Sequence, residues 1–428
     1  MPLALSYHLR RVSARWHRLR LALHARGWRG LLARVAGGSP HGAELRTSTR
    51  PTIPGGERAA SAPRVLVVDV TTPRPDRDSG SMRALRLMEL LVELGYRVDF
   101  LPDDGRDADR YSDALAAAGV AVHHLPGAGA RLRWLRAHAA DCTAVVVSRY
   151  HLAEGLFPLL RGIAPQARLV LDTVDLHHLR EQREGDQRGD RALLRLSATT
   201  RRRELAMIAM ADTTWVVSPV EQALLARELP AATVRVVSNV HDAETDVPGP
   251  QARRGVLFVG GAGHPPNLDA VSWLLETLWP MLRAAIADLE LHLVGDGLPA
   301  FVGAPPAGVV IHGHVPDLGP LLRRVRVGVA PLRFGAGVKG KVNLGMAHGL
   351  PMVVTGCAAE GMHLVDGEHA FVADAPADFV ERVVRVCNDD ALWARMSRAG
   401  QAHVAHRFSI AAARDAVCAS LPPTNPSP

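Results

Sequence analysis

The residues best suited to chemistry are two lysines, Lys339 and Lys341, in the glycine-rich stretch RFGAGVKGK at residues 333–341. The chain has 50 lysine and arginine side chains, and all the others are arginines. A glycine-rich loop that enters a helix lets backbone N–H groups approach an anion, and the helix N-terminus adds partial positive charge. A lysine supplies a mobile full charge without the rigid fork of arginine. The stretch therefore predicts a phosphate-binding loop; the alternative is a surface loop with incidental lysines.

This loop differs from two common nucleotide-binding motifs. The spacing from Gly335 to the lysines is wrong for a P-loop, and no Ser or Thr follows Lys341 to hold a magnesium ion. No G-x-G-x-x-G with an acidic residue about 20 positions later opens either half of the chain, which argues against a dinucleotide-dependent oxidoreductase. The sequence therefore predicts a phosphate site of another kind.

The segments that must position this loop alternate between short β-branched runs and helix-length stretches. Such alternation specifies a parallel sheet covered by helices. We therefore predict an α/β fold with two doubly wound Rossmann-like domains, residues 64–240 and 255–407, which face a cleft and are joined by a linker at 241–254. The predicted strands are RVLVVDV, YRVDFLP, VAVHHLP, TAVVVS, ARLVLDTVD, TTWVVS and TVRVVSN in the first domain, and GVLFVGG, LELHLVGD, GVVIHG, VRVGVAP and PMVVTG in the second.

Ligands of such sheets bind outside the carboxyl ends of the strands, so the loops that follow the strands are the informative ones. The cleft between the two domains should hold the substrate. Four strand-end loops carry glycine, polar and charged residues. They are the lysine loop, SGS at residues 79–81, DTVDLHH at residues 172–178 and GGAGHPPNLD at residues 260–269.

The positive charge of the chain belongs to its N-terminus. The net charge is +7, but residues 1–60 hold 11 Arg and 2 Glu, which is +9 and leaves −2 for the rest. An apolar stripe with alternating spacings of four and three predicts a basic amphipathic helix. Residues 1–35 then either lie in the headgroup layer of an anionic membrane, or pack on their own domain or in a short coiled coil. The stripe consists of Leu5, Leu9, Val12, Trp16, Leu19 and Leu23.

The rest of the composition bears on partners and location. A Pro/Gly/Ser/Thr-rich tether leads from the basic helix to residue 63, which completes an N-terminal extension at residues 1–63. Nucleic acid is not expected as a partner, because the remaining chain is slightly acidic. The N-terminus lacks the apolar core of a signal peptide, no run reaches the ~18 apolar residues of a membrane span, and the four cysteines have no paired spacing. We expect a cytoplasmic protein, peripheral at the inner face of the cell membrane if the helix binds lipid.

From residue 64 to about residue 417 the chain resembles the GT-B glycosyltransferases that use nucleotide sugars, particularly the large retaining family of bacterial polysaccharide and glycolipid assembly (glycosyl transferases group 1 type). The resemblance implies transfer of a hexose from a nucleotide sugar to a glycan or lipid-linked acceptor. It also implies a helix at residues 408–421 that crosses back to the first domain, before a tail at 422–428. The matching stretches are RVLVVDVTTPRPDRDSGSMR, LDTVDLHHLREQRE, WVVSPVEQALL, VRVVSNVHD, VLFVGGAGHPPNLDAVSWL, PLRFGAGVKGKVNLGMAHGLPMVVTGCAAEGM and DDALWARMSRAG with the later HRFS.

The resemblance also places functional residues. The basic pair that binds the donor diphosphate falls on Arg333 or Lys339, with Lys341 nearer the helix start, and such charges make a metal ion unnecessary. The histidine near the donor sugar falls on His177, with His178 as the weaker choice, and Asp175 could orient it. Helix caps or turns are the structural alternatives for several of these residues. The remaining donor contacts fall on Ser79, Gly80, Ser81, Gly261, Asn267, Glu360 and Gly361.

This sequence lacks two acidic residues that many members of the family carry. Many members carry two glutamates separated by seven residues around the lysine loop, and ungapped alignment places those positions at Ala336 and Leu344. Asn343 or Glu360 could bind the ribose hydroxyl instead. Alternatively the chain is a catalytically degenerate relative that acts as a sugar-binding scaffold or a membrane-associated partner. A literal Asp-x-Asp of the kind used by metal-dependent transferases occurs at residues 107–109, but its polar surroundings favour a solvated helix start.

Overall fold

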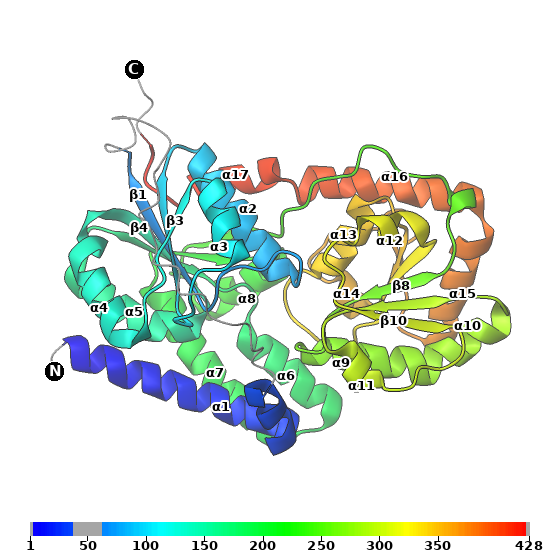
Figure 1. Cartoon of the computed structure of the whole chain (residues 1–428), viewed down its shortest axis with the longest axis horizontal. Coiled ribbons are helices and arrows are strands. Elements are labelled where there is room, and N and C mark those ends of the chain that lie inside the picture. The colour runs from blue at the N-terminus through cyan, green and yellow to red at the C-terminus, as the bar shows by residue number, and fades with distance from the viewer. Residues whose placement is uncertain (1–2, 37–61, 425–428) are drawn as a thin grey trace.

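Two parallel β-sheets, each flanked by helices, lie side by side, and a long N-terminal helix runs along the first of them (Figure 1). The computed structural model describes residues 3–36 and 62–424, with side chains for all of these except residues 25–36. The predicted α/β class with two doubly wound domains is confirmed. The predicted tether at residues 37–63 lies almost wholly outside the described residues, as does the end of the predicted tail.

The first sheet has seven parallel strands in the order β3-β2-β1-β4-β5-β6-β7. All six residues of β1 are buried, because helices cover both faces, and the strand therefore reads as a continuous apolar run. In β1, Val65 lies opposite Val98 of β2 on one side and Ala144 of β4 on the other. The strands are β1 (Arg64–Asp69), β2 (Arg97–Pro102), β3 (Val120–Val122), β4 (Cys142–Ser148), β5 (Arg168–Asp172), β6 (Thr213–Val216) and β7 (Val234–Val236).

The second sheet has six parallel strands in the order β10-β9-β8-β11-β12-β13. The sequence predicted five of them; the sixth, β13, is only two residues long and leaves no β-branched run to recognise. The strands are β8 (Val256–Val259), β9 (Leu291–Val294), β10 (Val309–Gly313), β11 (Val327–Ala330), β12 (Met352–Val354) and β13 (Phe371–Val372).

Helices connect the strands in both domains, and three single-turn segments, η2 (Ala139–Asp141), η3 (Pro250–Ala252) and the π-turn η4 (Leu274–Leu278), supplement them. The helices of the first domain are α2 (Ser79–Glu93), α3 (Arg110–Ala117), α4 (Gly127–His138), α5 (Tyr150–Ile163), α6 (His177–Arg188), α7 (Arg191–Met210) and α8 (Pro219–Glu228). The later helices are α9 (Pro265–Trp273), α10 (Trp279–Ala285), α11 (Leu298–Val302), α12 (Gly319–Arg324), α13 (Gly340–Ala347), α14 (Gly356–Ala359), α15 (Pro376–Asn388), α16 (Asp390–Arg407) and α17 (Ile410–Cys418).

The last helix returns to the first domain. After α16 the chain turns at Ser409, whose side chain caps α17. Ala413, Val417 and Leu421 then join the same hydrophobic cluster as the strands of the first sheet. The indole of Trp215 on β6 donates a hydrogen bond to the Ser420 hydroxyl over 2.9 Å. The chain therefore crosses between the domains twice, once through the segment after β7 and once between α16 and α17 (Figure 1).

Each sheet has one point where the strand order reverses. In the first sheet this point lies between β1 and β4, and in the second it lies between β8 and β11. The crevice outside the carboxyl ends of such strands is the usual ligand site of a doubly wound sheet. The loops after β1, β4, β8 and β11 are therefore expected to line the site, and the two lysines belong to the last of them.

The N-terminal helix, α1 (Leu3–Ala36), packs on the first domain with the face opposite to its apolar stripe. Its contacts run mainly along α5 and in part along α7, and the side chains buried on this inner face are Tyr7, Arg11, Ala14 and His17. The predicted helix and its packing on its own domain are observed, but Leu9 and Trp16 of the stripe face outward. No helix in the described part of the chain is long and apolar enough to cross a membrane.

Candidate functional site

The lysine loop connects β11 to α13, and Lys339 is the residue that precedes the first turn of this helix. The Lys339 ammonium is buried and donates hydrogen bonds to the carbonyl oxygens of Ala336, over 3.1 Å, and Gly337, over 2.6 Å. Burial lowers the pKa of Lys339 below its ordinary value. No side chain caps α13, so its first backbone N–H groups point into the loop without a side-chain acceptor. The loop thus combines a helix N-terminus with a buried cation.

Lys341 joins this loop to the loop after β8. Its ammonium donates to Asn267 Oδ1 over 2.6 Å and lies 4.3 Å from the centre of the Phe258 ring. The Asn267 amide in turn donates to the carbonyl oxygen of Gly261 over 2.9 Å. The structure therefore brings together three of the predicted residues, Gly261, Asn267 and Lys341, from both loops at the switch point of the second sheet.

Arg333 is held away from this pair by other partners. Its guanidinium donates two hydrogen bonds to the carboxylate of Asp269 on α9, over 2.8 and 2.5 Å, and stacks 5.8 Å from the Trp273 ring. Among the described residues, its hydrogen bonds go only to Asp269. Lys339 and Lys341 are therefore the two cations at the start of α13, and Arg333 takes no part in that arrangement.

The first turn of α2 meets the first turn of α13 across the domain boundary. Asp78 caps α2 and accepts hydrogen bonds from the Ser81 backbone, over 2.7 Å, and from the Ser81 hydroxyl, over 2.9 Å. A Cβ atom at Gly340 would lie 2.3 Å from the Cβ atom of Ser79, so only glycine allows this approach. Gly80 lies in the same turn. Two helix N-termini, one from each domain, thus converge beside the lysines, which favours an anion between them.

The loop between β5 and α6 borders the same place from the first domain. A Cβ atom at Gly337, which has φ +67°, would lie 3.2 Å from the Cβ atom of Asp175. Asp175 forms an ion pair with Arg180, and His177 Nδ1 lies 3.5 Å from the Asp175 carboxylate. Burial alone would raise the pKa of Asp175, but the charge of Arg180 outweighs it and the pKa falls to about 2. Val174 has φ +65°, a strained conformation for a β-branched residue that marks this loop as constrained.

Glu204 on α7 holds the start of α6 in place, and no sequence motif marks this residue. Its carboxylate is fully buried and accepts hydrogen bonds from the backbone N–H groups of His177 and His178, each over 3.2 Å. The His178 ring also donates to it over 2.6 Å. Burial would raise the pKa of Glu204, but the hydrogen bonds from both histidines lower it to about 2. His178 is thus turned into the core, and His177 is the less buried of the two histidines.

An ion pair closes the boundary between the domains. Arg183 of α6 donates to both oxygens of Glu360, over 2.7 and 2.8 Å, and to the carbonyl oxygen of Gly335 over 2.7 Å. Next to it, Gly361 has φ +75°, and a Cβ atom there would lie 2.6 Å from the Cβ atom of Ser218. Glu360 is therefore engaged by the first domain in this conformation, and a ligand that uses its carboxylate must displace Arg183.

The second of the two positions that lack an acid is occupied by Leu344. Its side chain packs against the hydrophobic cluster of the second domain. Asn343 beside it is fully buried, and within the described residues neither atom of its amide has a hydrogen-bond partner. An unpaired buried amide is costly and calls for an explanation such as a ligand. Asn343 therefore remains the candidate for the role of the missing second acid.

One residue of the Asp-x-Asp motif at residues 107–109 has a structural role. Asp109 is the N-cap of α3 and forms a capping box with Ser112, so the helix-start interpretation is confirmed. In the part of the chain that the structure describes, no cluster of three or more His, Cys, Asp or Glu side chains has the arrangement of a metal site.

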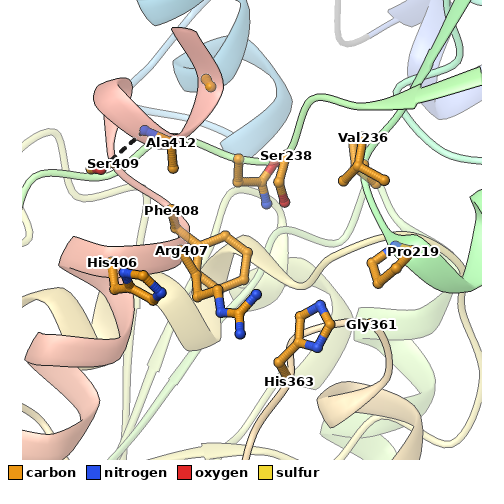
Figure 2. Close-up of a pocket in the computed structure, with 13 residues that line it drawn as sticks. Pro219, Val236, Ser238, Gly361, His363, His406, Arg407, Phe408, Ser409 and Ala412 are labelled. Atoms are coloured by element: carbon orange, nitrogen blue, oxygen red, sulfur yellow. Dashed lines mark hydrogen bonds between the residues drawn. The ribbon is translucent and has the colours of Figure 1, made fainter. Parts of the chain in front are cut away.

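A cavity of about 320 Å³ lies at the junction of the domains, beside the crossing between α16 and α17 (Figure 2). Figure 2 shows the side chains of Arg407 and His363 turned toward the open space between them. Of the predicted site residues, only Gly361 lines this cavity. The cavity lies beside this crossing, whereas the lysine loop contacts the α2 turn and the β5–α6 loop directly across the domain boundary.

Comparison with known proteins agrees with this architecture. Residues 253–389, which span most of the second domain, match the family described as Glycosyl transferases group 1. Comparison with curated proteins gives no match.

Among solved structures, the chain is similar to sucrose-phosphate synthase from Thermosynechococcus elongatus, with a TM-score of 0.65 and 15% identity over 82% of this chain and 96% of that one. It is also similar to Alr3699/HepE from Anabaena in complex with UDP and glucose, with a TM-score of 0.62 and 14% identity over 83% and 98% of the two chains. The chain is similar as well to a TarM mutant from S. aureus in complex with fondaparinux, α-GlcNAc-glycerol and UDP, with a TM-score of 0.54 and 11% identity. This similarity covers 68% of the present chain but only 57% of TarM. These structures share the GT-B fold with this chain.

Proposed function

We propose that this protein is a glycosyltransferase that moves a sugar from a nucleotide-sugar donor to an acceptor bound by the first domain. The observation that carries the proposal is the convergence of Lys339, Lys341 and two helix N-termini at the facing switch points of the two sheets. The match of residues 253–389 to group 1 glycosyltransferases supports it, as does the similarity to HepE, which binds UDP and glucose. A nucleoside diphosphate has the charge that such a site would recognise.

The mechanism follows from the charges that develop in the reaction. Cleavage of the bond between the anomeric carbon and the diphosphate leaves positive charge on the sugar and negative charge on the phosphate. Lys339, Lys341 and the N–H groups of α13 would stabilise the leaving diphosphate, and preorganised donors in a closed site can contribute several kcal/mol. We propose that these charges serve in place of a metal ion. His177 and Asp175 would border the sugar from the first domain.

Retention of the anomeric configuration is part of the proposal. The departing phosphate can itself accept the proton of the acceptor hydroxyl, so no enzymic nucleophile is needed. Closure of the domains through the ion pair of Arg183 and Glu360 would exclude water and limit hydrolysis of the donor.

The acceptor is proposed to be a glycan or a lipid-linked glycan in cell-surface polysaccharide assembly, and the transferred sugar a hexose. A cytoplasmic protein at the inner face of the cell membrane would meet such an acceptor. The outward apolar stripe of α1 is the feature that supports this location.

A second function is favoured by one observation. Both glutamate positions of the family hold apolar residues here, Ala336 and Leu344, so the site could bind a nucleotide sugar without turning it over. The chain would then be a sugar-binding scaffold.

A thermal-shift screen against nucleoside diphosphates and nucleotide sugars tests the proposal. We expect one nucleotide to raise the melting temperature, because a ligand that binds only the native state stabilises it. If no member of a panel that covers uridine, guanosine, adenosine, cytidine and thymidine diphosphates and their sugars shifts the transition, the proposed donor site is wrong.

Proton uptake by Lys341 gives a separate prediction. Burial, and then the charge of Lys339, lowers the pKa of Lys341 to about 7. A phosphate beside it would favour the charged form and raise that pKa, so binding should take up about one proton at pH 8 and should weaken as the pH rises above 7. Calorimetry in buffers of different ionisation enthalpy measures the uptake. Lys341→Met should abolish it, and an identical uptake in this variant would assign the proton to another group.

A further inference from the structure

Helix α1 is mounted on the first domain with its apolar stripe turned to solvent. The exposed fraction is 49% for Leu5, 52% for Leu9, 52% for Val12 and 62% for Trp16. These residues recur at spacings of four and three, so they form one stripe along the helix. Scattered exposed apolar residues are ordinary, but a continuous stripe that includes tryptophan marks an interaction surface. We call these four residues the outer stripe.

The inner face of α1 fixes this rotation with polar contacts. Arg11 donates to both carboxylate oxygens of Asp103, over 2.5 and 2.6 Å, and His17 lies 2.8 Å from the Thr200 hydroxyl. A Cβ atom at Gly155 of α5 would lie 2.9 Å from Cγ of Arg11, so this glycine is what lets the helix approach. Turning the outer stripe inward would break this buried ion pair. The outward orientation is therefore built into the fold.

The charged side chains that α1 itself contributes are all positive. Residues 1–43 contain no Asp or Glu. Arg10, Arg15 and Arg20 are exposed, and none of them forms an ion pair with another described residue. Their long stems can extend along an apolar surface while the guanidinium groups reach phosphate. An apolar stripe with unpaired arginines at its borders fits the boundary between headgroups and acyl chains of an anionic bilayer.

We infer that the outer stripe of α1, with Arg10, Arg15 and Arg20, is a docking surface for an anionic lipid bilayer. A second copy of this chain is a poorer fit, because two such faces would bring arginines together without a single nearby acid from either helix. The charge thus favours lipid phosphate over self-association.

The docking surface also indicates the kind of acceptor that the site would use. This inference rests on the proposed glycosyl transfer. Arg18 of α1 lies 3.0 Å from His151 Nε2, and the His151 ring lies 5.9 Å from the ring of His177. The side chains of Arg18 and His151 thus connect the helix that would lie on the bilayer to His177, the histidine that borders the candidate sugar site. We infer that the acceptor is lipid-linked and reaches the site from the bilayer.

Vesicle sedimentation of the full-length protein tests the docking surface. The probes are vesicles of phosphatidylcholine alone and vesicles that also contain phosphatidylglycerol. We expect binding to the anionic vesicles only, and a loss of at least about tenfold in Leu9→Glu/Trp16→Glu, since two charges would enter the apolar layer. The matched control is Val310→Glu/Val365→Glu, which changes two exposed valines of the second domain and should bind as the unchanged protein does.

Three results would overturn the inference. They are no binding to anionic vesicles, equal loss in both double variants, and equal binding to neutral vesicles. If Leu9→Glu/Trp16→Glu instead converts a dimer to a monomer in size-exclusion chromatography, the stripe is a self-association surface. The assay needs no donor, so a protein that binds vesicles but no nucleotide would refute the proposed function and leave the docking surface standing. The cooperative thermal unfolding transition of each variant, measured without nucleotide, shows that its domains are folded.

Discussion

Lys339→Ala is expected to weaken the binding of the nucleoside diphosphate about tenfold to hundredfold and to slow sugar transfer about 10²- to 10³-fold. The ammonium is buried at the start of α13, where it is held by two carbonyl oxygens of its own loop. It would therefore meet the diphosphate without reorganising at the moment of reaction. The larger effect on transfer is expected because charge accumulates on the diphosphate only as the bond breaks.

Isothermal calorimetry and initial rates with the donor identified by the nucleotide screen measure the two effects. Arg254→Ala is a matched control, because Arg254 is an exposed basic residue of the same domain, and among the described residues its side chain donates hydrogen bonds only within its own loop. If both variants lose the same affinity, Lys339 acts through general charge and the α13 loop is not the diphosphate site.

Asp175→Ala is expected to lower the free energy of unfolding of the first domain by about 2–3 kcal/mol. Asp175 and Arg180 form an ion pair in which the side chains are only 15% and 20% exposed, so the variant leaves a mostly buried guanidinium without its carboxylate. Asp175→Ala/Arg180→Met should recover most of the loss, because the uncompensated charge is gone. Urea denaturation of the two single variants and the double variant gives the coupling energy.

The pH dependence of the same pair supplies an internal check. The pKa of Asp175 is lowered to about 2, below its ordinary value, so its stabilising effect is present at neutral pH and is lost as the pH falls from about 4 to about 2. The difference in stability between the unchanged protein and Asp175→Ala should therefore shrink over that range. A difference that does not change with pH would mean that the ion pair contributes nothing.

The sheets and the lysine loop were predictable because their signals are local. Runs such as VLVV and AVVV are typical of buried parallel strands, and among the described strands only one of two residues escaped recognition. Gly261, Asn267 and Lys341 follow two strands that flank one switch point, so topology alone placed them together.

The partners that hold the site were not predictable, because they lie far apart in the sequence. Arg183 and Glu360 are 177 residues apart in the sequence, and they meet across the boundary between the two domains. Glu204 lies in the middle of a long helix whose sequence gives no sign that its carboxylate caps another helix. The direction of the α1 stripe depends on Asp103 and Thr200, which belong to the domain and not to the helix.

Single-turnover release of the nucleoside diphosphate from the bound nucleotide sugar shows whether the two lysines assist its departure. We expect the unchanged protein to release the diphosphate rapidly with an acceptor glycolipid and slowly with water. Lys339→Ala should bind the donor more weakly and release the diphosphate at least about a hundredfold more slowly. A donor that binds tightly and is not cleaved in the presence of any lipid-linked acceptor would mean that the lysines do not assist departure, and it would assign the chain to the sugar-binding scaffolds.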